Sequence, residues 1–330
     1  MGIPQTASRV EAADYQGDFG GLSGASARMQ RVYHLIAKVA VKRDPVLILG
    51  ESGTGKELVA RAIHWKGPWW DRPFVPIDCG ALTPTLIESE MFGHVRGAFT
   101  GATQSRQGLL AAAGEGTVFL DEIAELPVEL QPKLLRALQE CEIKPLGSND
   151  RTPVKARIVA ATNQDLETAI KCGSFRKELY FRLNVVSIKL PPLRERREDI
   201  PGLVRFFLAK HKASLVGITG VSDEAMARLM GYEWPGNVRE LENCIQRALA
   251  LGSAPQIRVE DLPSNLLYFV GQPRHDVAAL ATLRELEQRH ILQALEATKG
   301  DRLRAARLLG IGKTTIYRKL KEYGLEDVAL

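Results

Sequence analysis

Short apolar runs recur along the first 190 residues, and stretches with apolar residues at helical spacing separate them. The runs are short and several are rich in Val and Ile, which favours β-strands over buried helices. Strands that alternate with helical crossovers predict a parallel sheet covered on both faces. The expected strands are Pro45–Leu49, Phe74–Ile77, Thr117–Leu120, Ile158–Ala161 and Val185–Leu190.

Beyond Pro191 and Pro192 the strand signals stop and helical patterns take over. Helices are expected at Glu198–Ala213, Ser222–Met230 and Gly236–Leu251, with Pro235 at a first-turn position of the last one. Ser253–Pro273 contains three prolines and no sustained period, which indicates a connecting region. A small helical subdomain is therefore expected after the sheet, with further helices closing the chain.

The composition fits a globular chain of two or three domains: 330 residues, 45% hydrophobic and 25% charged. The first residues lack the apolar core of a secretory signal, and no apolar run reaches the ~18 residues of a membrane span. We therefore expect a cytoplasmic protein without a membrane partner. Cys79, Cys141, Cys172 and Cys244 are scattered, which predicts reduced thiols rather than a metal site.

The basic character is concentrated near the C-terminus. The whole chain has 44 basic and 39 acidic side chains, a net charge of +5. Asp301–Gly324 alone has a net charge of +5. A concentrated basic face suggests nucleic acid, although a solvated helix face is the commoner meaning of such a run. The basic residues of this segment are Arg302, Arg304, Arg307, Lys313, Arg318, Lys319 and Lys321, against Asp301 and Glu322.

A phosphate-binding loop follows the first expected strand and precedes a helical segment, which is the context that G-x-x-x-x-G-K requires. Its glycines let backbone N–H groups converge on phosphate oxygens, and Lys56 can reach the β and γ phosphates. Glu57 stands where a Ser or Thr hydroxyl usually ligates magnesium. The nucleotide-binding residues are expected to be Gly50, Glu51, Ser52, Gly53, Thr54, Gly55, Lys56 and Glu57.

Two carboxylates end the third expected strand. Strand ends face the ligand crevice in doubly wound sheets, so Asp121 is expected to hold Mg²⁺ and Glu122 to orient and deprotonate the attacking water. The alternative is that the two acids only cap the next helix.

Phe92–Ala102 contains GAFTGA, a pattern that folding does not require. Gly97 and Gly101 make a poor helix and a poor strand, because Gly costs roughly 0.5–1 kcal/mol in either. The segment predicts a flexible loop that presents Phe99. In most Gly-rich loops such a ring tucks back onto the body instead.

With these motifs, the chain resembles the sigma-54-dependent transcriptional activators, or bacterial enhancer-binding proteins, of the AAA+ ATPase superfamily, from about Phe19 to Leu325. GESGTGKE, including Glu57, is similar to that family's phosphate loop. ESEMFGHVRGAFTGA at Glu88–Ala102 is similar to its defining loop, which engages the sigma factor. The resemblance implies sigma-54 contact by Gly97, Ala98, Phe99, Thr100, Gly101 and Ala102, above all by Phe99 and Thr100.

Further segments carry the same resemblance. Asn163, after a strand, corresponds to the first sensor, which reports the γ-phosphate. FRKELYFRL makes Arg176 and Arg182 candidate arginine fingers for a neighbouring subunit's ATP, an effect typically worth roughly 10³–10⁵ in rate. WPGNVREL implies that Arg239 is the second sensor, reaching the nucleotide from the helical lid. Without the resemblance, each arginine would more often be a surface ion pair.

Asp78 departs from the family pattern, in which an Asn restrains the catalytic glutamate by donating a hydrogen bond. An ionised Asp has no proton to donate, and beside Glu122 it would repel. We hypothesise that this switch is altered here or that one of the two acids is protonated.

The basic C-terminal segment predicts a helix-turn-helix: an amphipathic helix at Leu283–Thr298, a second from Gly300–Asp301 to Leu309, a corner at Gly310–Gly312, and a third at Lys313–Leu320. It resembles a Fis-type DNA-binding domain; a basic protein-binding module is the alternative. Ala305, Ala306, Leu309, Ile311, Ile316 and Leu320 are expected inside, and Lys313, Thr314, Thr315, Tyr317, Arg318 and Lys319 on the DNA.

The expected domains are a tail at 1–18, an AAA+ α/β subdomain at 19–190, a helical lid at 191–262, a linker at 263–280 and an all-α helix-turn-helix domain at 281–330. Only the short tail precedes the ATPase, so no sensor domain is expected in this chain. The resemblance implies a ring, expected to be a hexamer and dimeric through its DNA-binding domains. The ring would bind enhancer DNA and use ATP to open the complex of sigma-54 RNA polymerase with the promoter. A nucleotide-gated repressor and a general AAA+ unfoldase remain as alternatives.

Overall fold

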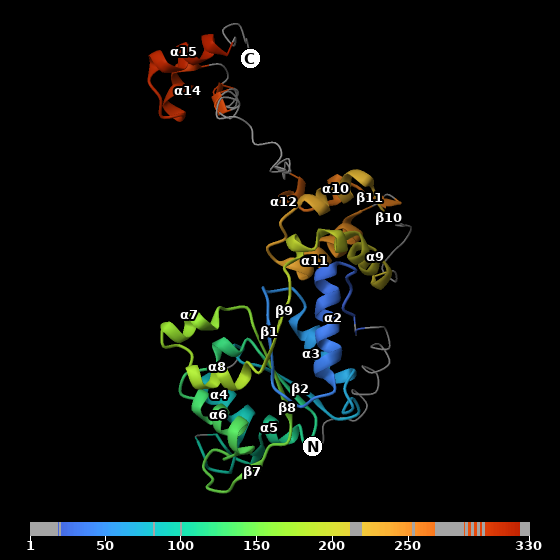
Figure 1. Cartoon of the computed structure of the whole chain (residues 1–330), viewed down its shortest axis with the longest axis vertical. Coiled ribbons are helices and arrows are strands. Elements are labelled where there is room, and N and C mark those ends of the chain that lie inside the picture. The colour runs from blue at the N-terminus through green and yellow to red at the C-terminus, as the bar shows by residue number, and fades with distance from the viewer. Residues whose placement is uncertain are drawn as a thin grey trace. The chain divides into compact units, whose positions relative to one another are not determined.

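The computed structural model describes residue 19, residues 21–81, 83–99, 101–211, 220–252 and 255–267, and near the C-terminus residues 287, 290, 291, 294, 295, 298 and 301–323. The chain divides into two compact units, Met1–Phe269 and Val270–Leu330, each of which is described by itself (Figure 1). None of the helices within these residues is long and apolar enough to span a membrane.

The first unit is built on a five-stranded parallel sheet with the order β2-β5-β8-β1-β9. All the strands expected from the apolar runs are confirmed, and so is the fold class. The first strand, β1, lies inside the sheet with the phosphate loop at its carboxyl end. The bounds are β1 Val46–Leu49, β2 Phe74–Asp78, β5 Thr117–Asp121, β8 Arg157–Thr162 and β9 Val186–Lys189.

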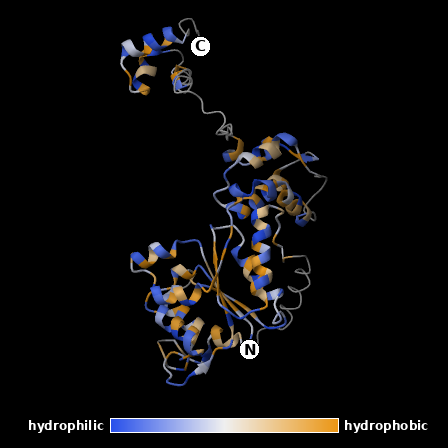
Figure 2. Ribbon diagram, viewed as in Figure 1, coloured by the Kyte–Doolittle hydropathy of each residue, from blue (hydrophilic) through white to orange (hydrophobic). Residues whose placement is uncertain are grey.

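Two hydrophobic cores lie on the two faces of this sheet because successive strand residues point to opposite sides. Val46 and Ile48 of β1 pack in one core, whereas Leu47 packs in the other. Figure 1 shows helices on both sides of the strands, and the strands are coloured hydrophobic in Figure 2. One core is covered by α2 Ala27–Ala40 and α3 Lys56–Trp65, and the other mainly by α4 Pro84–Phe92, α5 Leu109–Ala112, α6 Gln131–Glu140, α7 Leu166–Lys171 and α8 Lys177–Leu183.

A helical subdomain follows the sheet, as expected. Its core surrounds the fully buried Trp234, whose indole Nε1 donates to Leu229 O at 2.8 Å. Helix α11 begins at Asn237, so Pro235 precedes the helix rather than lying in its first turn. The elements are η2 Leu193–Glu195, η3 Arg197–Asp199, α9 Ile200–Lys210, β10 Gly220–Val221, α10 Asp223–Gly231 and α11 Asn237–Leu251.

The lid extends further than the sequence indicated. β11 Gln256–Ile257, η5 Val259–Asp261 and α12 Ser264–Leu267 lie within the segment expected to connect the domains. Ile257, Leu262 and Leu266 are buried in the lid core. The expectation of a connecting region over Ser253–Pro273 is therefore wrong for residues 255–267. Residues 255–262 lie within the lid expected at 191–262, whereas α12 lies in the linker expected at 263–280 and packs with the lid instead. These elements are too short to show a hydrophobic period, so only their buried positions identify them.

In the second unit, α14 Arg302–Leu308 and α15 Lys313–Glu322 form the second and third of the three expected helices. The first, expected at Leu283–Thr298, lies mostly outside the described residues. Asp301 caps α14, with its Oδ1 accepting from Leu303 N and Arg304 N at 3.0 Å each. Gly310, with φ 67°, makes the turn between them, a conformation that favours glycine. Ala305, Ala306, Ile316 and Leu320 are buried together with Ile291, Ala294 and Leu295, while Leu309 and Ile311 pack against this core.

Candidate nucleotide-binding and catalytic site

The phosphate loop joins β1 to α3 and lines a cavity of about 500 Å³ between the sheet and the lid. Gly53 and Gly55 have φ 75° and φ 102°, values that other residues rarely adopt, and Gly55 is the N-cap of α3. This is the geometry that turns successive N–H groups toward a bound anion at a helix N-terminus. Of the expected nucleotide-binding residues, Ser52, Gly53, Thr54, Gly55, Lys56, Glu57 and Arg239 line the cavity.

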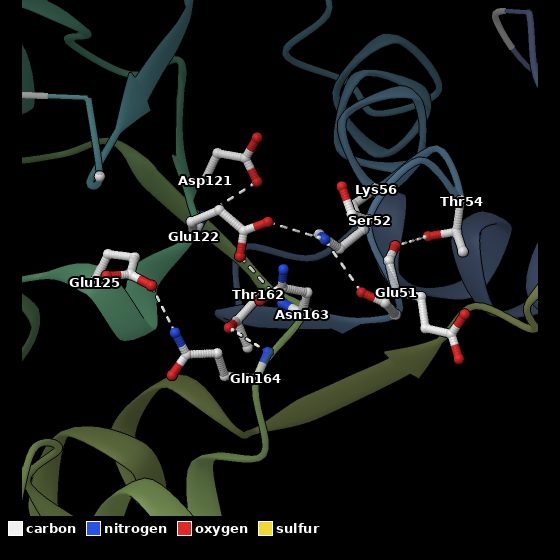
Figure 3. Close-up of polar contacts among 12 residues, drawn as sticks. Glu51, Ser52, Thr54, Lys56, Asp121, Glu122, Glu125, Thr162, Asn163 and Gln164 are labelled. Carbon is white, nitrogen blue, oxygen red and sulfur yellow. Dashed lines mark hydrogen bonds and ion pairs between the residues drawn. The ribbon is translucent and has the colours of Figure 1, made fainter. Parts of the chain in front are cut away.

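Lys56 and Glu122 meet at the base of this cavity (Figure 3). Lys56 is only 7% exposed, and its Nζ donates to Glu122 Oε1 and to Gly50 O, both at 3.1 Å. The other Glu122 oxygen accepts from Asn163 N at 3.1 Å. Glu122 has φ 47°, a strained conformation costing on the order of 1 kcal/mol, and such strain concentrates at functional sites.

Asp121 lies at the end of β5 on the wall of the same cavity. Its pKa is raised, first because burial disfavours the charged carboxylate and then because Glu122 adds a second negative charge. A divalent cation would relieve both effects, so the donor chemistry fits Mg²⁺. Within the described residues no group of three or more His, Cys, Asp or Glu forms a metal cluster. Mg²⁺ needs none, because phosphates and water supply most of its ligands.

Two expected nucleotide-binding residues turn their side chains elsewhere. In Figure 3 the Glu51 side chain points away from Lys56 and Glu122. Its carboxylate accepts from both Arg194 Nη atoms, at 2.6 and 2.8 Å, and these bonds lower its pKa to about 2. Glu57 pairs with Arg61 one turn along α3, Nε to Oε1, at 3.0 Å. Glu57 therefore does not replace the missing hydroxyl directly in this geometry.

The lid contacts the phosphate loop at the start of α11. Val238 N and Arg239 N donate to Gly53 O at 3.0 and 3.3 Å, and Arg239 Nη1 donates to Ser52 Oγ at 3.3 Å. A Cβ on Gly53 would lie 2.2 Å from Gly236 O, so only glycine fits there. Arg239 thus reaches the cavity from the lid, and its role as second sensor stays a prediction.

Neither arginine-finger candidate lines the cavity of its own chain. Arg176 is exposed beside Glu178, with 3.6 Å between Nε and Oε2. Arg182 donates through Nε and Nη2 to Leu138 O at 3.1 and 2.7 Å. The Arg176 backbone N donates to Gln131 Oε1 at 2.8 Å, so the fully buried Gln131 fixes the start of α8.

The GAFTGA segment forms the tip of a hairpin between β3 Gly93–His94 and β4 Arg106–Gln107. Gly97 N donates to Ala102 O at 2.9 Å, and Gly97 and Gly101 have φ 82° and φ 100°. The Phe99 ring is half-buried and packs edge-on to His94, with 5.1 Å between centroids. The ring is thus not fully presented, contrary to our expectation from the glycines. Thr100 lies outside the described residues.

Asp78 ends β2 directly opposite Asp121 of β5. Its Oδ1 accepts from Gly80 N at 2.9 Å, a local contact that an Asn could also make. Glu122, by contrast, is held by Lys56 and Asn163. The role of Asp78 in hydrolysis stays a hypothesis.

The expected DNA-contacting residues lie on α15. Lys313, Thr314, Tyr317 and Arg318 are exposed, and Thr315 is half-buried. Lys319 is less available than expected, because its Nζ lies 2.7 Å from Glu287 Oε2.

The sequence patterns predicted no role for Arg194, Arg196, Asn237 or Gln131. Arg196 is 1% exposed and donates through Nη2 to Thr54 O at 3.2 Å. The only signal for the arginines was the charged segment Arg194–Asp199 after Pro191 and Pro192, in which three arginines are balanced by three acids. Asn237 was noted only as part of the WPGNVREL segment, without a role of its own.

The fold and site define an AAA+ ATPase joined to a helix-turn-helix unit. The Sigma-54 interaction domain model matches residues 22–189, the AAA+ ATPase lid domain model matches 194–279, and the model for bacterial regulatory proteins of the Fis family matches 282–323. The chain belongs to the sigma-54-dependent transcriptional activator family.

Several characterised proteins are similar to this chain. Regulatory protein AtoC of Escherichia coli is 46% identical over 88% of this chain and 65% of its own length. Response regulator protein PilR of Pseudomonas aeruginosa is 44% identical over 92% of this chain and 70% of its own. The chain thus spans about two thirds of the length of these relatives. Crystal structures of NtrX from Brucella abortus with ADP and with ATP match with TM-scores of 0.71 and 0.72 at 33% and 32% identity, covering 97% of this chain and 72% of theirs.

Proposed function

We propose that this protein binds Mg²⁺-ATP in the cavity between sheet and lid and hydrolyses it. The phosphate loop and Lys56 bind the β and γ phosphates. Asp121 holds Mg²⁺, which neutralises phosphate charge when bound. Glu122, hydrogen-bonded to Lys56 and Asn163, orients the attacking water and accepts its proton. Asn163 and Arg239 sense the nucleotide from the sheet and from the lid.

Hydrolysis is proposed to require a ring, expected to be a hexamer. Arg176 and Arg182 lie outside the cavity of their own chain, which suits action on the ATP of a neighbouring copy. An arginine supplied in trans typically raises the rate of phosphoryl transfer roughly 10³- to 10⁵-fold, so assembly would switch hydrolysis on.

The work of the ring is proposed to be remodelling of the sigma-54 RNA polymerase closed complex toward the open complex. Residues 97–102, above all Phe99 and Thr100, contact sigma-54. The helix-turn-helix unit binds enhancer DNA through Lys313, Thr314, Thr315, Tyr317, Arg318 and Lys319, and pairs subunits into dimers. ATP can drive this only if the loop differs between nucleotide states, because equal affinity in all states would shift nothing.

The observation that supports this proposal is the path from the catalytic centre to the loop. Cys79 N donates to Asp121 O at 3.0 Å, so the end of β2 is tied to the residue beside Glu122. Helix α4 follows β2 and leads into β3, which carries the GAFTGA segment. Changes at the γ-phosphate thus have a short route to Phe99.

The test is open-complex formation on a sigma-54 promoter with wild type, Glu122→Ala and Thr100→Ala. Both variants should fail, Glu122→Ala by losing hydrolysis and Thr100→Ala while still hydrolysing ATP. Activation that survives both substitutions would contradict the proposal. Regulation of a target promoter that is unaffected by Thr100→Ala would instead support a nucleotide-gated repressor.

A further inference from the structure

The outer side of the phosphate loop is fully engaged by the lid and the segment that leads into it. Three consecutive carbonyls each accept a hydrogen bond: Ser52 O from Asn237 Nδ2 at 3.0 Å, Gly53 O from Val238 N at 3.0 Å, and Thr54 O from Arg196 Nη2 at 3.2 Å. A phosphate loop holds its ligand with N–H groups, so its carbonyls face outward. Here those outward groups define where the lid sits.

Glu51 adds an ionic contact to this arrangement. Its carboxylate receives both Nη atoms of Arg194, and Asn237 Nδ2 approaches Oε2 at 3.2 Å. Two parallel bonds to one guanidinium fix direction as well as distance. Arg194 belongs to η2, the first turn after the sheet, so this pair ties the loop to the entrance of the lid.

Asn237 links the phosphate loop, the segment that contains Leu193 and the start of α11. It is fully buried and has φ 53°, a left-handed conformation that Asn tolerates better than most residues. Its Oδ1 accepts from Leu193 N at 2.8 Å, while its Nδ2 reaches Ser52 O. Because Asn237 is the first residue of α11, its side chain sets where the helix starts, and Arg239 lies two residues further on.

Glu51 is not among the described residues that line the cavity, and its side chain points away from Lys56 (Figure 3). It therefore acts at a distance from the phosphates. Resting on the proposed ATPase function, we propose that Glu51, Arg194 and Asn237 form a clamp that positions Arg239 against the nucleotide. The three are positioning residues: they act on ATP through the placement of Arg239.

The clamp couples the position of the lid to the affinity for nucleotide. A nucleotide that is held by both the loop and Arg239 favours the clamped arrangement, and the clamp in turn favours binding, since coupling between sites is reciprocal. Breaking the clamp should leave the loop able to bind phosphate but leave Arg239 free to swing away. Breaking the clamp should therefore reduce ATP hydrolysis in a protein that has Arg239 and have little further effect in a protein that lacks it.

The test is a double-mutant cycle on the full chain with Glu51→Ala, Arg239→Ala and the double variant, measuring kcat and KM for ATP and the Kd of ADP. Glu51→Ala is expected to lower kcat/KM about tenfold, since small misplacements remote from the chemistry have effects of this size or larger. In the Arg239→Ala background the same change should cost less than about twofold, because groups that act together are not additive.

Glu51→Gln should recover part of the loss, because one amide oxygen can still accept from Arg194. Glu195→Ala is the matched control: Glu195 neighbours Arg194 but pairs with Arg28 on an exposed surface, so kcat and KM should not change. Thermal unfolding shows whether Glu51→Ala is folded. If it is not, Arg194→Lys replaces it in the cycle, because Lys keeps the positive charge but cannot make the two paired bonds.

Kinetic constants for Glu51→Ala within about twofold of wild type would overturn the clamp, and so would an equal loss with and without Arg239. A wild-type protein that does not hydrolyse ATP would contradict the proposed function instead. In that case the ADP titrations still test whether the clamp exists, since Glu51→Ala should weaken ADP binding only when Arg239 is present.

Discussion

Lys56 Nζ lies 3.1 Å from Glu122 Oε1, so the lysine of the phosphate loop and the carboxylate at the end of β5 form an ion pair at the base of the cavity. The same carboxylate is oriented by Asn163 N. The proposed phosphate-binding lysine and the proposed water-activating carboxylate therefore lie side by side.

Glu122→Gln should therefore separate binding from hydrolysis. Gln keeps one acceptor oxygen, enough for either Lys56 Nζ or Asn163 N, and its amide cannot take a proton, so ATP hydrolysis should fall roughly 10²- to 10⁴-fold. ADP affinity should stay near wild type. Steady-state hydrolysis and ADP titration measure the two effects. Glu125→Gln, whose parent side chain accepts from Gln164 Nε2, is the control and should hydrolyse normally. A Glu122→Gln variant with more than about half the wild-type rate would show that Glu122 is not the base.

Gln131 positions the segment that carries the proposed arginine finger Arg176. Its amide donates to Leu126 O and Ser174 O at 3.0 Å each and accepts from Arg176 N. Gln131→Leu leaves these buried groups unsatisfied, which should reduce the free energy of unfolding by about 1–3 kcal/mol. It should also reduce ATP hydrolysis in the assembled protein by moving Arg176. Gln30→Leu, at an exposed site on α2, should change stability by less than ~0.5 kcal/mol.

Denaturant unfolding and ATPase assays at high protein concentration test this pair. Stability that is equal in Gln131→Leu and Gln30→Leu would mean that the buried amide bonds contribute nothing. Normal ATP hydrolysis in a destabilised Gln131→Leu variant would show that the contacts of Gln131 with the start of α8 do not affect the action of the proposed arginine fingers.

His94 holds the half-buried ring of Phe99. An aromatic pair of this kind contributes ~0.5–1.5 kcal/mol, so His94→Ala should loosen the tip of the hairpin. Exposed Arg96 lies in this loop, and trypsin should cleave after it several-fold faster in the variant, since cleavage tracks the open population. Ser89→Ala removes only the 2.7 Å contact of Ser89 Oγ with His94 Nδ1 and should have a smaller effect. Identical cleavage rates in all three proteins would show that the ring is not held by His94.

His64 makes stability depend on pH. It is 2% exposed, and burial lowers its pKa from 6.5 to about 4. Between these values the unfolded chain binds a proton that the folded chain does not, so stability falls as pH drops from 6.5 to 4. The full loss is roughly 3 kcal/mol. His64→Gln should remove this part of the pH dependence, whereas exposed His34→Gln should leave it intact, as urea unfolding at pH 7 and pH 5 would show. Parallel pH profiles for wild type and His64→Gln would exclude His64 as the source.

Most of the fold could be predicted because its signals are local. The apolar runs that became β1 and β5, the glycines of the phosphate loop and the Asp301 cap depend on residues within a few positions of one another. The clamp could not be predicted, since Arg194 and Glu51 are 143 residues apart and only the folded chain brings them together. The packing of Phe99 on His94 was missed for a related reason: glycines predict freedom of the backbone, not the partner of a side chain.

Asp78 allows a direct test of the hypothesis that the glutamate switch is altered in this chain. Burial and the charge of Glu122 raise the pKa of Asp121, and the charge of Asp78 adds to that rise. Asp78→Asn removes one negative charge while preserving the contact with Gly80 N, so the pKa of Asp121 should fall. The acid limb of the ATPase pH profile should then move to lower pH.

Profiles of wild type and Asp78→Asn between pH 5 and 9 measure this directly, with exposed Asp71→Asn as the charge-matched control. If Asp78 also fails to restrain Glu122 as a donor would, the Asn variant should change the maximal rate as well as the pH limb, because its amide can donate where a carboxylate cannot. An acid limb that shifts while the maximal ATPase rate stays the same would mean that Asp78 acts only through its charge. Superimposable profiles would remove Asp78 from the coupling between hydrolysis and the loop.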